Sequence, residues 1–201
     1  MTFEQAAAIP QAGMLALQGL LERGPLRPGQ TILINGAGGG VGTFAIQLAK
    51  LHKVEVTGVD SAAKLDMLRS MGFDHVIDYE KEDFTRSGKC YDLILDAKTN
   101  RSPFDYARAL NPKGTYATVG GAIPRLLQVL ILGPWIRRMT KKNLLLVGLK
   151  PNKDLAYLNE LFEAGNLVPV IDGPYKFSEA RQAFGLFGAA NHKGKIVITM
   201  D

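Results

Sequence analysis

A run of glycines between two apolar segments constrains the fold of this chain more than any other feature. The run is Gly36-Ala37-Gly38-Gly39-Gly40-Val41-Gly42. It follows residues 31–35, a stretch typical of a buried strand, and precedes residues 41–51, whose apolar positions recur at helical spacing. Read from Ala37, the run has the form A-x-G-x-x-G, a variant of the motif that binds dinucleotides between a strand and a helix.

The small residues of this motif each have a physical purpose. We expect Ala37 to make the tight turn, Gly39 to let the backbone approach a pyrophosphate, and Gly42 to let the helix pack closely on the strand. Unpaired N–H groups at the start of the helix then bind phosphates without a charged side chain. Asp60 ends the second predicted strand, where a carboxylate accepts a hydrogen bond from an adenosine ribose. The alternative is a glycine-rich turn in an unrelated α/β protein, which would not require this acid.

Strand–helix alternation continues along the chain and predicts the fold class. Strands are predicted at 54–59, 75–78, 91–96, 115–119, 144–149 and 196–199, and helices at 62–71, 104–110 and 155–164, with a further helix capped by Ser178. This order indicates an α/β fold, a doubly wound parallel sheet (Rossmann-type) with helices on both faces and ligands at the carboxyl ends of its strands. Residues 3–21 predict a helix interrupted at Pro10.

The same pattern suggests three parts of the chain. Residues 1–30 are expected to form a helix that leads in from another segment, residues 31–150 the nucleotide-binding domain, and residues 151–201 a C-terminal part with helices and a returning strand.

Composition excludes several classes of protein. With 46% hydrophobic and 21% charged residues, the 201-residue chain can bury a sizeable core, which excludes global disorder. One Cys and three scattered His (His52, His75 and His192) disfavour a disulfide framework and a zinc site, so we predict no metal site. A net charge of +5 favours anionic ligands. The sequence lacks the motifs of phosphate-loop NTPases, of α/β-hydrolases and of short-chain dehydrogenases.

Two segments bear on location and partners. The apolar run at 126–136 is too short to span a bilayer, so we expect a helix that docks on a core or a partner, with a membrane-surface segment as the alternative. The basic cluster at 137–142 lacks interleaved aromatic side chains, which favours a solvated helix end over a site for RNA or anionic lipid. The N-terminus has no basic-then-apolar signal segment. We therefore expect a cytoplasmic protein that binds neither nucleic acid nor membrane.

Several segments together resemble one family. Residues 31–50, Thr-Ile-Leu-Ile-Asn-Gly-Ala-Gly-Gly-Gly-Val-Gly-Thr-Phe-Ala-Ile-Gln-Leu-Ala-Lys, closely resemble medium-chain dehydrogenases/reductases, and within them the zinc-free quinone oxidoreductase branch that includes zeta-crystallin. Residues 3–10, 71–79 and 194–198 are similar to that family's interdomain helix, third strand and closing strand. The resemblance implies the cofactor-binding domain without the N-terminal GroES-like domain, from an enzyme that passes hydride from NAD(P)H to a quinone, enone or similar acceptor.

The resemblance also implies which residues hold the cofactor, although no catalytic acid stands out. It assigns backbone contacts with the pyrophosphate to Gly39, Gly40, Val41 and Gly42, the coenzyme preference to Asp60, Ser61 and Lys64, and the adenine-side ribose and phosphate to Tyr79. It assigns the nicotinamide side to Gly120, Gly121, Val147, Gly148 and Leu149, and a contact with the cofactor to Asn100 and Lys195. Each has a simpler alternative in helix packing, a turn or a surface position; Lys64 equally fits a solvated helix face.

The preference between NAD and NADP stays open, as do two other functions. Asp60 favours NAD, because a carboxylate repels a 2′-phosphate, whereas Ser61 and Lys64 favour NADP. The first alternative function is an NAD(P)-dependent alcohol dehydrogenase or reductase of the same superfamily. The second is a non-catalytic NAD(P) sensor or protein-interaction module. The partners expected are a small-molecule substrate and a second copy, paired through the edge at 144–149 as a homodimer.

Overall fold

A six-stranded parallel sheet forms the centre of the fold in the computed structural model, which describes residues 1–22 and 24–200. The strand order is β3-β2-β1-β4-β5-β6, and each neighbouring pair is parallel. The strands are β1 Thr31–Asn35, β2 Glu55–Asp60, β3 His75–Asp78, β4 Tyr91–Asp96, β5 Leu110–Thr118 and β6 Asn143–Leu146. The direction of winding reverses between β1 and β4, so the predicted doubly wound sheet is confirmed, and a ligand crevice belongs at the carboxyl ends of these two strands.

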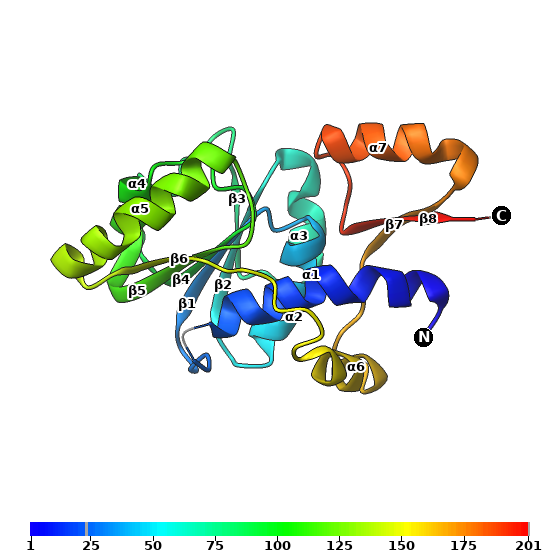
Figure 1. The fold of residues 1–201 in the computed structure, drawn as a ribbon, viewed down its shortest axis with the longest axis horizontal. Helices are drawn as coiled ribbons and strands as arrows, with labels where there is room; N and C mark the ends of the chain where they lie inside the picture. Colours follow the sequence, from blue (N-terminus) through cyan, green and yellow to red (C-terminus); the bar gives the residue numbers. More distant parts are fainter. Residues whose placement is uncertain (23, 201) are drawn as a thin grey trace.

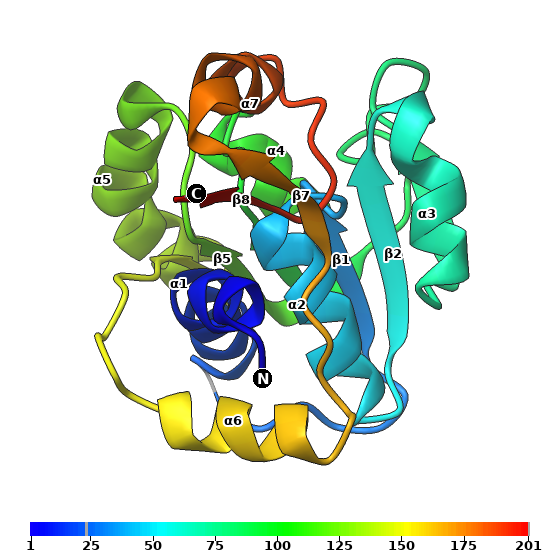
Figure 2. The ribbon, with the colours of Figure 1, turned by 90° about the vertical axis from the view of Figure 1, so that its right-hand side faces the viewer.

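Helices cover both faces of the sheet (Figures 1 and 2). They are α1 Phe3–Leu21, α2 Gly40–Lys50, α3 Leu65–Ser70, α4 Pro103–Arg108, α5 Ile123–Thr140, α6 Leu155–Glu163 and α7 Ala180–Gly188. Side chains alternate along β1: Ile32 and Ile34 pack with α1 and α2 on one face, and Leu33 packs with α4 and α5 on the other. The buried strands are therefore apolar on both sides, which is why the sequence reads as short continuous apolar runs.

Helix α1 is continuous, so the predicted interruption at Pro10 is wrong. Pro10 lacks the N–H of one helical hydrogen bond, which normally kinks or ends a helix. Here Thr2 and Gln5 form a capping box at the start, and ten residues of the helix are buried against the sheet and α2. Tertiary packing holds the helix through the proline.

The C-terminal part forms a separate two-stranded parallel sheet, β7 Ile171–Lys176 and β8 Lys195–Thr199, with α7 over it. Strand β7 was not predicted because Gly173-Pro174 interrupts it and none of its residues is fully buried. The predicted cap at Ser178 is wrong, since residues Phe177–Glu179 form a 3-10 turn and α7 starts at Ala180. Residues 23 and 201 of the predicted segments 1–30 and 151–201 lie outside the described residues.

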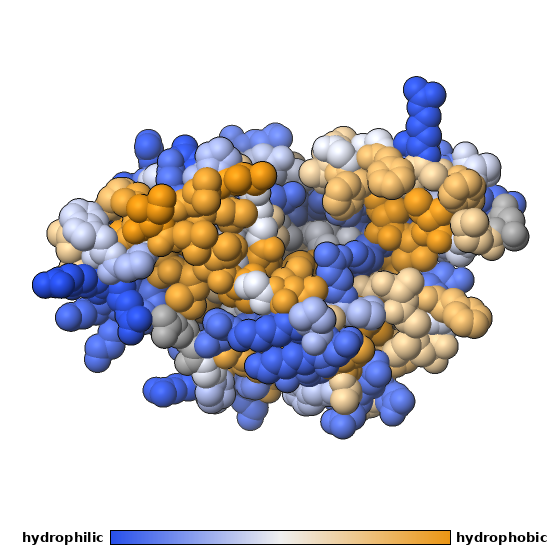
Figure 3. Space-filling view, viewed as in Figure 1, coloured by the Kyte–Doolittle hydropathy of each residue, from blue (hydrophilic) through white to orange (hydrophobic). Residues whose placement is uncertain are grey.

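Two groups of apolar side chains remain on the surface. Figure 3 shows one over α5 and another over α7 and β8. On α5 the exposed side chains include Ile131 (74% exposed) and Trp135 (53%), and on α7 they include Phe184 (69%). The predicted apolar run is thus a helix, with one face packed on the sheet and another open. Within the described residues, no helix combines the length and the apolarity needed to cross a bilayer.

Candidate nucleotide-binding site

Two adjoining clefts lie where β1 and β4 end. The first has a volume of about 750 Å³ and is lined by the ends of β1 and β2, the start of the following helix and the loops after β3 and β4. The second, of about 480 Å³, is lined by α1, the start of α2 and the segment from α7 to β8. Gly36, Lys98 and Ala190 belong to both linings, so the clefts form a continuous path around the glycine-rich loop.

The tight turn of the glycine-rich loop runs from Gly36 to Gly39, whose N–H donates to the Gly36 carbonyl at 3.1 Å, so Ala37 lies in this turn as predicted. Gly36 has φ +85°, a left-handed conformation that favours glycine, whereas Ala37 is fully buried in the core. The N–H groups of both residues donate to the carbonyl of Val59, at 3.0 and 3.1 Å, which ties the loop to β2. A Cβ on Gly42 would overlap the Ala37 carbonyl oxygen, so Gly42 does permit the close helix packing expected of it.

The amino end of α2 presents free N–H groups to the second cleft. Gly39 is the N-cap residue, and no side chain of the described residues caps the helix. The first helical hydrogen bond runs from Thr43 N–H to the Gly39 carbonyl. Gly39 and Gly194 form a parallel bridge, which directs the Gly40 N–H at the Gly194 carbonyl, so the N–H groups of Val41 and Gly42 are left without a partner in the described part of the chain. Gly39, Gly40 and Val41 all line the second cleft. Together with the helix dipole, these donors make a site for an anion.

Asp60 holds the glycine-rich loop in place. Its Oδ2 accepts a hydrogen bond from Gly38 N–H at 2.8 Å, and its Oδ1 accepts one from Ser61 N–H at 2.9 Å. Lys64 Nζ lies 3.5 Å from Oδ1 and donates to the Ala190 carbonyl at 2.7 Å. Lys64 is only 3% exposed, so a solvated helix-face lysine is excluded. The two charges largely offset each other, and Asp60 does not act as an isolated negative charge on the first cleft.

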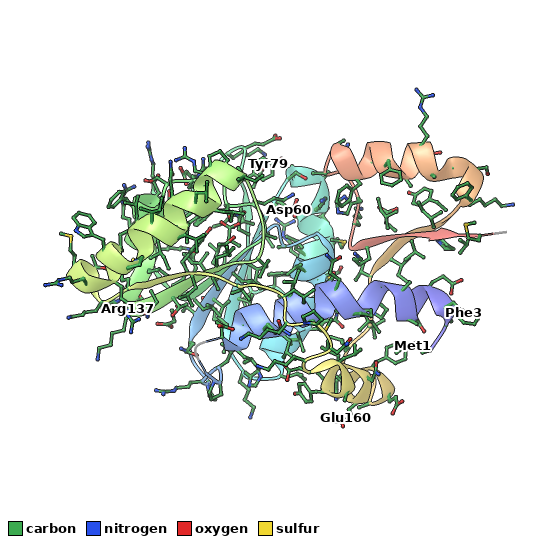
Figure 4. All side chains as sticks on the ribbon, viewed as in Figure 1. Met1, Phe3, Asp60, Tyr79, Arg137 and Glu160 are labelled. Carbon is green, nitrogen blue, oxygen red and sulfur yellow. The ribbon has the colours of Figure 1, made fainter. Side chains whose placement is uncertain are left out.

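Three further predicted cofactor residues meet in the first cleft. Ser61, Tyr79 and Asn100 line it together with Asp60. Figure 4 labels Asp60 and Tyr79, which lie at the same end of the sheet. Tyr79 is half exposed, and partial burial, with the neighbouring Glu80, raises the pKa of its hydroxyl above the usual value, so the ring is neutral at pH 7.

A buried carboxylate beneath the crevice fixes the loop after β4. Asp96 is fully buried and accepts hydrogen bonds from the Asn35 side chain (2.9 Å), the Tyr116 hydroxyl (2.9 Å), and the N–H groups of Lys98 (2.7 Å) and Thr99 (3.0 Å). Burial and the nearby Asp96 charge raise the pKa of the Tyr116 hydroxyl far above its usual value, so it always donates. Neither Asp96 nor Lys98 was singled out from the sequence.

The segment between α7 and β8 closes the second cleft. Gly194 N–H donates to the Gly38 carbonyl at 2.8 Å, and the side chain of Lys195 lies against Gly40. His192 lines the same cleft and stacks on Phe187 with ring centroids 5.1 Å apart. Burial, then the charges of Lys64 and Lys98, lower the pKa of its imidazole, which is therefore neutral at pH 7. No motif around His192 indicates that this histidine lies at the crevice.

A profile described as "Zinc-binding dehydrogenase" matches residues 71–198. The chain belongs to this family. A chloroplastic quinone oxidoreductase, QR1, of Triphysaria versicolor is 32% identical over 96% of this chain and 61% of its own length. A chloroplastic NADPH-dependent alkenal/one oxidoreductase of Arabidopsis thaliana is 32% identical over 98% of the chain and 47% of its own length. The predicted medium-chain dehydrogenase/reductase membership, with quinone oxidoreductases among the relatives, is confirmed.

Structural comparison agrees with the family assignment. The quinone oxidoreductase from Coxiella burnetii is 27% identical, with a TM-score of 0.81 over 98% of this chain and 61% of that protein. The chain thus spans about half to three fifths of the length of these relatives. What is similar is the cofactor-binding part, which holds the crevice described above.

The family description mentions zinc, and the described residues offer no site for it. No group of three or more His, Cys, Asp or Glu side chains in residues 1–22 and 24–200 is arranged to hold a metal ion.

Several predicted cofactor residues lie outside the two clefts. They are Ala37, Gly42, Lys64, Gly120, Gly121, Val147, Gly148 and Leu149. Gly121 has φ +141° and packs on the backbone of Lys98 and Thr99, so its lack of a side chain serves the loop after β4. Strand β6 ends at Leu146, and Val147 is buried in the core, so 147–149 do not continue the predicted strand.

Proposed function

We propose that this chain is the NAD(P)-binding part of an oxidoreductase, whose bound cofactor, as NAD(P)H, supplies hydride to a quinone- or enone-type acceptor. The observation that carries the proposal is the meeting of two clefts beside the free N–H groups of Val41 and Gly42 at the start of α2. A dinucleotide consists of two nucleosides joined by two phosphates, and this path offers a compartment for each half with an anion site beside it. The names of the relatives support the acceptor class.

Each cleft has its own part in this proposal. The first cleft, with Ser61, Tyr79 and Asn100, takes the adenosine half, and the second, with Gly39 to Val41, takes the nicotinamide half. Asp60, in the wall of the first cleft, fixes the glycine-rich loop, and Lys64, behind that wall, fixes the segment that carries Ala190. Contacts of Gly120, Gly121 and residues 147–149 with the nicotinamide side stay predictions from the resemblance.

The preference between NAD and NADP stays open in this proposal. The Asp60–Lys64 pair, 3.5 Å apart and buried, weakens both the repulsion that would exclude a 2′-phosphate and the attraction that would favour it. Ser61 and Arg101 line the same cleft, but Arg101 lies 3.3 Å from the carboxylate of Asp83. Competing titrations with NADH and NADPH therefore measure a preference that charge alone does not fix.

The test is calorimetric titration of the purified chain with NADPH and with NADH, next to a Gly39→Asp variant. Gly39 has φ −86° and ψ 178°, which any residue adopts, and the nearest atom to a Cβ there is the Gly36 carbonyl oxygen at 3.4 Å. Aspartate is also a favoured N-cap residue, so the variant should fold. Its carboxylate would occupy the phosphate position with the wrong charge and should weaken binding by at least about a hundredfold.

Gly185→Asp is the matched control, because it adds the same charge on α7, where a Cβ meets no atom within 4 Å. Its Kd should stay within about twofold of the unchanged chain. Saturable binding that only Gly39→Asp abolishes supports the proposal. Failure of the unchanged chain to bind either cofactor, or equal binding by Gly39→Asp, contradicts it.

Two other functions fit parts of the structure. An alcohol dehydrogenase or reductase of the same superfamily would use the same clefts, and substrate profiling with quinones, enones and alcohols separates it. A non-catalytic NAD(P) sensor or interaction module is favoured by the exposed apolar side chains of α5 and α7. That function predicts cofactor binding together with capture of a protein partner and no turnover.

We also retain a homodimer through the sheet edge at 144–149. Strand β6 is the last strand of the larger sheet, and Leu146 is 38% exposed. An unpaired edge of this kind can pair with a second copy. Light scattering should give twice the chain mass, and Leu146→Asp should lower it; a monomer at high protein concentration would contradict the dimer.

Three further expectations stay predictions from the sequence. They are the cytoplasmic location, hydride transfer without zinc, and the division of the chain at 1–30, 31–150 and 151–201.

A further inference from the structure

Lys98 stands at the junction of the two clefts. It follows β4 by two residues and lines both clefts, a property that it shares only with Gly36 and Ala190 among the described residues. Its side chain runs along the backbone of Gly36, where a Cβ would lie 3.3 Å from Lys98 Cε. A ligand that extends from the first cleft into the second must therefore pass this side chain.

The backbone of Lys98 is fixed although its side chain is exposed. Its N–H donates to the buried Asp96 carboxylate at 2.7 Å, and its carbonyl packs closely against Gly121. The Asp96 network thus fixes where the side chain of Lys98 begins. Because the backbone of Lys98 is already fixed, only its side chain loses conformational entropy when it contacts a ligand.

Lys98 differs in charge balance from Arg101, which also lines the first cleft, and from the buried Lys64 behind it. Arg101 pairs with Asp83, and the deeper Lys64 pairs with Asp60. Among the described residues, the ammonium of Lys98 has no ion pair and no hydrogen bond. Its positive charge extends into the second cleft, where it is one of the groups that lower the pKa of His192. An uncompensated cation beside the free N–H groups of α2 calls for an anionic ligand.

We propose that Lys98 binds the pyrophosphate of the dinucleotide where it crosses from the first cleft to the second. This inference rests on the function proposed above and adds a charged side chain to a site that the motif explains through backbone alone. The N–H groups of Val41 and Gly42 would contact the pyrophosphate from the α2 side, and Lys98 from the β4 side. Charge-assisted contacts of this kind are stronger than neutral hydrogen bonds.

The test compares Lys98→Met with Lys89→Met. Both substitutions remove one positive charge from an exposed lysine next to β4, but Lys89 precedes the strand and Lys98 follows it, at the opposite end of the sheet. Calorimetry with NADPH and with ADP-ribose should give a Kd about tenfold higher for Lys98→Met and within about twofold of the unchanged chain for Lys89→Met. Lys98→Arg should retain most of the affinity.

Salt dependence separates a direct phosphate contact from a distorted cleft. For Lys98→Met, the slope of log Kd against log salt should fall relative to the unchanged chain, and for Lys89→Met it should not. If the unchanged chain binds NADPH but Lys98→Met binds as tightly as Lys89→Met, the role of Lys98 is wrong and the proposed function stands. If the unchanged chain binds neither NADPH nor ADP-ribose, both are overturned.

Discussion

The two sides of the glycine-rich loop differ in how their polar groups are satisfied. On the β2 side, Asp60 accepts hydrogen bonds from Gly38 and Ser61 and pairs with Lys64, so these groups satisfy one another within the chain. On the α2 side, the N–H groups of Val41 and Gly42 have no partner among the described residues. The first side can hold its shape without a ligand, whereas the second leaves donors for a ligand to satisfy. The difference separates residues that support the site from residues that bind.

A substitution at Gly42, where the packing around the loop is closest, should have the largest effect on stability. Gly42→Val should cost about 4 kcal/mol or more of the free energy of unfolding, because its Cβ would overlap the backbone of Ala37. Urea denaturation measures the loss. Gly185→Ala, on open α7, is the control and should change the free energy by no more than about 1 kcal/mol, in the stabilising direction. Equal stability of Gly42→Val and the unchanged chain would mean that α2 packs differently.

Removal of the Asp60–Lys64 ion pair on the β2 side should give the next largest loss in the free energy of unfolding. Asp60→Asn removes the partner of a lysine that is 3% exposed and should cost about 3 kcal/mol of the free energy of unfolding. The double variant Asp60→Asn with Lys64→Met removes the unpaired charge and should recover part of that loss. A double variant as unstable as the sum of the single ones would show that the two residues do not act as a pair.

The buried network beneath the crevice should respond more weakly to a single change. Tyr116→Phe deletes one of the hydrogen bonds to Asp96 and should cost about 1–2 kcal/mol, as measured by thermal or urea unfolding. Because the ring stays, the core packing is retained. A loss above about 4 kcal/mol would indicate that the loop after β4 collapses without this hydroxyl.

Alkaline pH tests the same network with a smaller expected effect. Burial, together with the nearby negative charge of Asp96, raises the pKa of the Tyr106 and Tyr116 hydroxyls above the usual value near 10. Above about pH 10 the unfolded chain releases these protons while the folded chain keeps them, so the free energy of unfolding should fall as pH rises. Ultraviolet titration should find these two tyrosines un-ionised at pH 11 while the fold persists. Ionisation of all tyrosines near pH 10 in the folded chain would contradict their burial.

Local patterns predicted the fold, but tertiary contacts determined the details of the site. The apolar runs at 31–35 and 91–96 and the glycines after the first of them fix the parallel sheet and the position of the crevice. The burial of Lys64 could not be anticipated, because its partner carbonyl on Ala190 lies far along the chain. Lys98 has no motif of its own, and its importance comes from two clefts that meet only in the folded chain. Strand β7, interrupted by Gly173-Pro174, lacks the apolar alternation on which strand prediction depends.

Amide chemical-shift mapping with NADPH tests most directly whether one dinucleotide occupies both clefts. The largest shifts should fall on the amides of Val41 and Gly42, with further shifts at Ser61 and Tyr79 in the first cleft and at His192 in the second. The amides of α5, on the far face of the sheet, should not shift. Saturable shifts in both clefts at one common Kd are the predicted result. Shifts confined to one cleft, or none at the start of α2, would contradict the account.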